Sequence, residues 1–166
     1  MSQKIDLTSL YEAQQKLDLR IAKNHNITYE KTRTDRLIAL LVEICEWANE
    51  TRCFKYWSYK SSSPKEITIE EYVDALHFFL SLGIDIKTSF VIYLLSSNEA
   101  KTLSEDFLEL FVLYGDFLKA QDDKTYQKAF GKFIDMSLKC GFSWTEVIEA
   151  YKRKLDINFK RQENNY

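Results

Sequence analysis

Proline and glycine are scarce in this chain, with one Pro and four Gly among 166 residues. A β-sandwich or barrel needs many tight turns, and tight turns depend on these two residues. Their scarcity argues against a turn-rich β architecture and favours long, uninterrupted helices. We therefore expect an all-α helical bundle, and the length fits a single domain covering residues 1–166.

Long apolar runs are also absent. No window of the sequence approaches the roughly 18 apolar residues of a membrane-spanning helix, and the first residues lack the apolar stretch of a secretory signal. We therefore expect a cytoplasmic protein without a membrane partner.

Neither sign of charge dominates, because the chain has 23 Lys and Arg residues and 25 Asp and Glu residues, which gives a formal net charge of −2. Such a chain has no general attraction to nucleic acid, so direct nucleic-acid binding is not expected. Any contact with phosphate must come from local placement of Lys and Arg.

The three cysteines do not form the pattern of a disulfide framework or a metal site. Cys45, Cys53 and Cys140 are odd in number and lack the spacing of metal ligands. They fall in amphipathic segments, where buried thiols are common. We interpret all three as reduced core residues.

Helical spacing of apolar residues runs through most of the chain. A first helix is expected from Asp6 or Thr8 to about Lys23, and later helices at about 103–120, at 125–139 and from the capping box of Ser143 and Glu146 to the C-terminus. Two further helices are expected between these. The apolar segment 89–95 fits either a strand or a helix.

A turn is predicted between the second and third helices. Ser61-Ser62-Ser63-Pro64 is the clearest break in the chain, and Thr68 with Glu71 has the pattern of a capping box that opens the third helix. Gly83 is the expected C-cap of that helix. In the resulting hairpin, the second helix must end soon after Glu46 or overhang the turn, because each residue adds about 1.5 Å.

Two acidic pairs, Glu43-x-x-Glu46 and Glu71-x-x-Asp74, lie on either side of this turn. Residues three apart share a helix face, so the hairpin would bring four carboxylates together. Each pair can be a solvated helix face, or the four can hold a hard cation such as Mg²⁺. Both pairs have apolar neighbours, which favours the cation, because acids in apolar surroundings are costly unless paired or metal-bound.

A di-iron carboxylate site is an alternative, since Asp74-x-x-His77 extends the second pair. Such a site needs two suitably placed histidines. The chain has only His25 and His77, and His25 falls in an apparent loop. We interpret His77 as a buried residue that supports the metal ligands without touching the ion.

The residues around the acidic pairs resemble a known family. Residues 43–46 and 71–74 are similar to the paired ExxE and ExxD metal motif of the all-α nucleoside triphosphate pyrophosphohydrolases, the MazG-like superfamily. Residues 48–58 and 74–78 look like the dimeric dUTPase branch of that superfamily. The basic C-terminal segment, with Tyr151-Lys152-Arg153-Lys154, Asn158, Arg161-Gln162 and Tyr166, is similar to the same branch.

This resemblance implies hydrolysis of dUTP, and also of dUDP, to dUMP, with release of pyrophosphate from dUTP. Such a reaction keeps uracil out of DNA and supplies dUMP. The resemblance also implies a homodimer with a four-helix metal-binding core, in which Mg²⁺, or Mn²⁺ in its place, is held by Glu43, Glu46, Glu71 and Asp74. Glu46 is our choice of general base.

The phosphate contacts follow from the same resemblance. Lys55, Lys154 and Arg161 are the candidates for holding the phosphates that the metal leaves uncovered, and Asn158 adds hydrogen bonds. Asn158 and Arg161 lie three apart, so one helix face can present both. Without the resemblance, the basic residues of 152–160 would read as a charge cluster that complements a helix C-terminus.

Base selection needs a stacking wall and an amide, because a hydrogen-bonding site rejects analogues better than an apolar pocket does. Trp57 is expected to stack on the base. Gln14, within a segment similar to the N-terminal helix motif of the family, is expected to read the uracil edge, with Asn49 as its alternative. Glu50 shares a face with the metal ligands and is expected to lie behind them.

Two further functions remain open at this point. One is a dCTP or broad-specificity housecleaning pyrophosphohydrolase, which would share the metal site and differ in the residues that read the base. The other is a helical interaction protein without catalysis, in which the acidic residues would serve as a recognition face.

Overall fold

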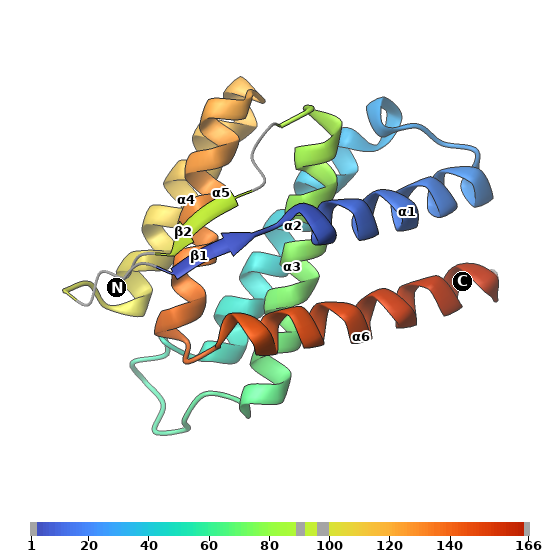
Figure 1. The fold of residues 1–166 in the computed structure, drawn as a ribbon. Helices are drawn as coiled ribbons and strands as arrows, with labels where there is room; N and C mark the ends of the chain where they lie inside the picture. Colours follow the sequence, from blue (N-terminus) through green and yellow to red (C-terminus); the bar gives the residue numbers. More distant parts are fainter. Residues whose placement is uncertain (1–2, 89–91, 96–99, 165–166) are drawn as a thin grey trace.

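The computed structural model describes residues 3–88, 92–95 and 100–164. Tyr166 of the C-terminal motif and residues 89–91 of the ambiguous apolar segment lie outside these ranges. The described part is almost entirely helical, which confirms the all-α prediction. Its elements are β1 (Gln3–Asp6), α1 (Thr8–His25), α2 (Tyr29–Thr51), α3 (Lys65–Asp85), β2 (Ile92–Leu95), α4 (Leu103–Ala120), α5 (Asp123–Lys139) and α6 (Trp144–Glu163) (Figure 1).

Helices α2 and α3 form the predicted hairpin at the centre of the molecule. Helices α4 and α5 lie on one side of it, and α1 and α6 extend together on the other side (Figure 1). Helices α1 and α6 run in the same direction, since Tyr151 is hydrogen-bonded to Leu10 and Gln162 to Asn24. The first and last helices of the chain therefore meet beside the central hairpin.

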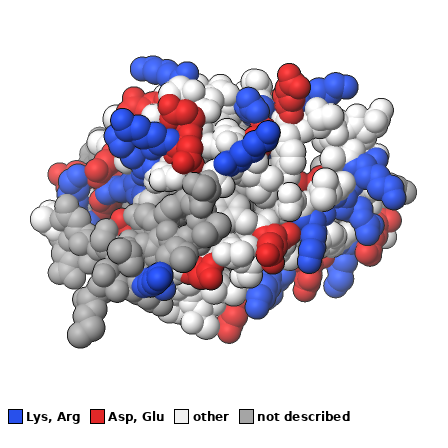
Figure 2. All heavy atoms as spheres, turned by 45° about the horizontal axis from the view of Figure 1, so that its top comes forward, with Lys and Arg blue, Asp and Glu red and all other residues white. Residues whose placement is uncertain are grey.

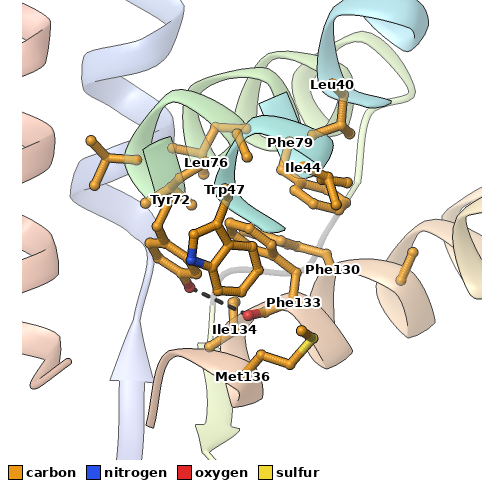
Figure 3. Close-up of a cluster of buried hydrophobic side chains, with 14 of the residues drawn as sticks. Leu40, Ile44, Trp47, Tyr72, Leu76, Phe79, Phe130, Phe133, Ile134 and Met136 are labelled. Carbon is orange, nitrogen blue, oxygen red and sulfur yellow. Dashed lines mark hydrogen bonds between the residues drawn. The ribbon is translucent and has the colours of Figure 1, made fainter. Parts of the chain in front are cut away.

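The core is an aromatic cluster between α2, α3, α4 and α5, with Trp47 at its centre (Figure 3). The Trp47 ring lies 4.7 Å from the Phe107 ring and 5.0 Å from the Tyr72 ring, and Tyr72 stacks on Phe133 at 4.3 Å. Trp47 follows Glu46 directly in the chain, so the packing that buries the indole turns the neighbouring carboxylate away from the core.

Helix α3 begins at Lys65, earlier than expected, so the predicted capping box is wrong. Thr68 already lies inside the first turn, where its hydroxyl donates to the carbonyl oxygens of Ser63 and Pro64. Pro64 is the N-cap, with φ −49° and an extended ψ of 149°, and the helix begins directly after it. Glu71 consequently lies in the second turn, and α2 overhangs the turn by continuing to Thr51.

Gly83 is not the C-cap of α3, because the helix continues to Asp85. A Cβ on Gly83 would lie 2.4 Å from the hydroxyl oxygen of Tyr126. Glycine therefore permits a close approach of α5 at this position.

The strand β1 pairs antiparallel with β2, with Gln3 opposite Leu95 and Asp6 opposite Ile92. Within the described ranges, no helix combines the length and hydropathy needed to cross a membrane. Figure 2 shows Lys and Arg side chains interspersed with Asp and Glu side chains, consistent with the small net charge.

All three cysteines are free. Cys53 and Cys140 are half-buried, but Cys45 is exposed on α2. The prediction that Cys45 is a core residue is therefore wrong.

Candidate functional site

A cavity of about 770 Å³ lies where α1, α2, α3 and α6 meet. Each helix contributes polar side chains to one shared space. Of the residues predicted from the sequence, the structure brings together here Gln14, Glu43, Glu46, Glu71, Asp74, His77, Lys154, Asn158 and Arg161.

Three glutamates form the acidic end of the cavity. One carboxylate oxygen from each of Glu43, Glu46 and Glu71 lies within 4.8 Å of the other two. Burial, together with repulsion from neighbouring carboxylates, raises the pKa of Glu43 to about 7 and also raises the pKa of Glu71. Close carboxylates repel one another when ionised, and a divalent cation bound between them would remove that repulsion. Hard cations prefer carboxylate oxygens as ligands, so these residues fit a metal ion.

Asp74 lies beside this group and is engaged by α6. Its Oδ2 atom is 2.8 Å from the Lys154 ammonium, and the two side chains are 19% and 20% exposed. Burial raises the pKa of Asp74, although the Lys154 ammonium opposes that shift. Among the described residues, the group within 4.8 Å comprises the three glutamates and does not include Asp74.

One face of α6 lines the cavity with polar groups. Lys154, Asn158 and Arg161 follow the i, i+4, i+7 spacing of a helix stripe, and all three line the cavity. The Arg161 guanidinium donates to the Asn158 side-chain oxygen at 3.2 Å, so these two residues share a face as predicted.

Gln14 is buried on the α1 side of the cavity, which we call its inner end, in a network of four side chains. Its Oε1 accepts from His77 Nδ1 at 2.7 Å and from the Tyr151 hydroxyl at 3.0 Å, and its Nε2 donates to Asp18 at 2.8 Å. Burial lowers the pKa of His77 to about 3, so the imidazole is neutral. Its Nε2 is buried without a hydrogen-bond partner among the described residues, and the ring borders the cavity.

Asp18 was not assigned a role from the sequence, yet it lines this inner end. Its carboxylate accepts from Gln14 and from the Tyr29 hydroxyl at 2.9 Å, and burial raises its pKa. The only local signal in the sequence was the spacing of four residues between Gln14 and Asp18.

A buried ion pair lies behind Tyr29. Arg36 pairs with Asp85 at 2.6 Å, a contact between residues 49 positions apart that no motif predicts.

Asn49, Glu50, Lys55 and Trp57 are not among the described residues that line the cavity. The Trp57 side chain is 64% exposed in the segment between α2 and α3. The Glu50 carboxylate accepts from the Ser63 hydroxyl and so fastens that segment to α2. The expected substrate contacts of Asn49, Lys55 and Trp57 stay predictions.

A family model described as dUTPase matches residues 6–166, which is nearly the entire chain. No curated protein matches the sequence. The family is that of the all-α dUTPases, and the helices that this structure brings together carry the motifs that pointed to it. The chain therefore belongs to the all-α dUTPase family and is a dUTP diphosphatase, which hydrolyses dUTP to dUMP.

Proposed function

We propose that Glu43, Glu46, Glu71 and Asp74 hold the divalent metal ion of this reaction, with Mg²⁺ as the ion and Mn²⁺ as its substitute. Carboxylate oxygens of Glu43, Glu46 and Glu71 lie within 4.8 Å of one another, and their surroundings raise the pKa of Glu43 to about 7, which supports this proposal. All-oxygen sites of this kind suit hard cations.

The residues that line the cavity have different roles in the proposed reaction. When bound, the metal ion neutralises phosphate charge and acidifies water. Glu46 is exposed to the cavity, whereas Glu43 and Glu71 are half-buried, so Glu46 is the carboxylate best placed to orient a water and accept its proton. The α6 face donates from Lys154, Asn158 and Arg161 to phosphate oxygens. We propose one domain, because helices from both ends of the chain complete this site.

We propose that the inner end reads the uracil base. Both lone pairs of the Gln14 oxygen and one of its N–H groups are engaged within the protein, which leaves one N–H for the substrate. The Asp18 carboxylate accepts from Gln14, Tyr29 and Ser81, and its two oxygens have acceptor capacity beyond these three partners. A donor beside an acceptor complements the 4-carbonyl and N3–H of uracil, whereas cytosine presents a donor at position 4 and an acceptor at N3.

Pyrophosphate release tests this function. With Mg²⁺ present, release is expected to be selective for dUTP over dCTP, dTTP and UTP. Treatment with EDTA should abolish it, and added Mg²⁺ should restore it. Equal rates on all four nucleotides would contradict the base-reading role of the inner end, and full activity in EDTA would contradict the metal site.

We propose a homodimer that forms through an apolar surface on α2 and α4. On α2, Ile38, Leu41 and Val42 are 59%, 37% and 47% exposed. On α4, Leu108 and Val112 are 65% and 66% exposed. An exposed apolar surface of this kind marks an interaction site.

The two helices pack against each other, and we infer that their exposed apolar residues form one surface. The Tyr114 hydroxyl of α4 donates to the Leu37 carbonyl of α2 at 2.5 Å, and the rings of Phe107 and Trp47 lie 4.7 Å apart. A second copy of the chain offers the same apolar surface, as a two-fold symmetric interface requires. We infer that this surface is buried in the dimer.

Substituting Val42→Asp is expected to convert the dimer to a monomer, because the new carboxylate would be buried without a partner. Light scattering at micromolar concentration measures the change. Ile67→Asp is the matched control, since Ile67 is 45% exposed on α3, outside the α2–α4 surface. A monomeric wild-type protein would refute the dimer, and a dimeric Val42→Asp variant would refute this interface.

A further inference from the structure

The ion pair between Lys154 and Asp74 separates one proposed metal ligand from the other three. Asp74 lies one helical turn after Glu71 on α3, where an oxygen ligand for the ion is expected. Its Oδ2 atom instead lies 2.8 Å from the ammonium of Lys154 on α6. The side chains are 19% and 20% exposed, so water screens the pair only in part.

The ammonium of Lys154 compensates charge that would otherwise accumulate in the cavity. Four acidic side chains, Glu43, Glu46, Glu71 and Asp74, line the same space. The positive charge of Lys154 acts against the burial that raises the pKa of both Glu71 and Asp74. Lys154 thus supplies part of the neutralisation that a bound cation would supply.

Lys154 also belongs to the face of α6 that carries Asn158 and Arg161, and all three line the cavity. A lysine ammonium sits on a flexible four-carbon stem and can turn between partners without movement of its helix. Asp74 lines this cavity, and a substrate phosphate bound at the α6 face would be a second anionic partner for the ammonium.

We propose that Lys154 and the metal ion compete for Asp74, so that metal binding breaks the Lys154–Asp74 ion pair and frees the ammonium for the polyphosphate of the substrate. This inference rests on the proposed metal site. The exchange makes metal and polyphosphate binding cooperative. When Asp74 moves from Lys154 to the metal ion, the ion gains its fourth carboxylate ligand and the Lys154 ammonium becomes available to bind phosphate.

Metal binding to the substrate-free protein tests the exchange. The probe is Mn²⁺ alone, and its binding is followed by loss of the electron paramagnetic resonance signal of the free ion. Removing the competitor with Lys154→Met is expected to tighten the Mn²⁺ dissociation constant about tenfold, within the usual range of coupling between linked sites. Lys152→Met, an exposed lysine two residues earlier on α6, should leave the constant unchanged.

A double-mutant cycle separates exchange from simple charge repulsion. If Lys154 competes for Asp74, the effect of Lys154→Met disappears when Asp74→Asn is already present, and Asp74→Asn alone weakens Mn²⁺ binding. If Lys154 only repels the ion, Lys154→Met tightens binding equally in both backgrounds. That second result would overturn the exchange, while binding by the three glutamates would still stand.

Inorganic pyrophosphate tests the second half of the proposal. In the wild-type protein, Mn²⁺ is expected to tighten pyrophosphate binding in isothermal titration, and Lys154→Met should reduce that gain about tenfold or more, whereas Lys154→Arg should keep most of it. An undiminished gain in Lys154→Met would overturn the role of the freed ammonium. Failure of the folded wild-type protein to bind Mn²⁺ at all would instead refute the metal site itself.

Discussion

Replacing Glu46 by Gln is expected to lower kcat for dUTP about a thousandfold or more, because both the metal charge balance and proton transfer depend on this carboxylate. Glutamine keeps the length and shape of the side chain. It cannot carry the negative charge that a cation requires, and its amide cannot accept a proton from water. The measurement is the initial rate of pyrophosphate release at saturating Mg²⁺ and dUTP.

The fold should survive this substitution. Glu46 is exposed and lies within 4.8 Å of two other carboxylates, so its neutralisation relieves repulsion in the metal-free protein. Circular dichroism and chemical denaturation should show an unchanged or slightly more stable protein. Glu30→Gln, at an exposed position in the first turn of the same helix, is the matched control and should retain full turnover. An active Glu46→Gln variant would contradict a metal site at the acidic cluster.

The position of Glu46 could be predicted because it depends on local rules. Two acids three residues apart share a helix face, and a clear break at residues 61–64 turns the next helix back along the first. The apolar spacing likewise gave the bounds of α4 as the structure has them, because an amphipathic stripe is a property of consecutive residues. Each of these signals is complete within about 20 residues of chain.

Local rules failed where two of them competed or where contacts were distant. Thr68 has the pattern of a cap, but Pro64 starts the helix earlier, and sequence alone does not rank the two. Gln14 was identified by resemblance, yet its contacts with His77 and Tyr151 span 63 and 137 residues. Such a network exists only once α1, α3 and α6 have packed, so neither Gln14's buried state nor the role of Asp18 could be read from the chain.

Replacing Asp85 by Asn is expected to lower the free energy of unfolding by about 3 kcal/mol, the lower end of the cost of removing one partner from a buried ion pair. The Asp85 side chain is 4% exposed and accepts from Arg33 and Arg36. Arg36, with 11% of its side chain exposed, would keep its buried charge but lose its ion-pair partner. The pair joins the start of α2 to the end of α3, and urea denaturation at pH 7 measures its loss.

The pH dependence of this loss has a definite sign. Burial of Asp85 opposes its ionisation, but the hydrogen bonds from Arg33 and Arg36 outweigh burial and hold its pKa below the ordinary value. A depressed carboxyl pKa contributes stability that is fully present above the ordinary aspartate pKa of about 4 and is lost as pH falls through the folded value. The difference between wild type and Asp85→Asn should therefore be constant from pH 7 to pH 5 and shrink at more acidic pH.

Two control variants separate the buried pair from surface charge. Arg33→Met should cost about 1 kcal/mol or less, because Arg33 is 36% exposed and Asp85 keeps its bond to Arg36. Asp35→Asn, an exposed carboxylate on α2, should change stability by no more than about 0.5 kcal/mol. If Asp85→Asn cost no more than these two variants, the Arg36 charge would be adequately solvated without Asp85. Because Arg36 also donates to the Tyr29 carbonyl, and the Tyr29 hydroxyl donates to Asp18, that result would also remove Asp85 as an anchor of the inner end of the cavity.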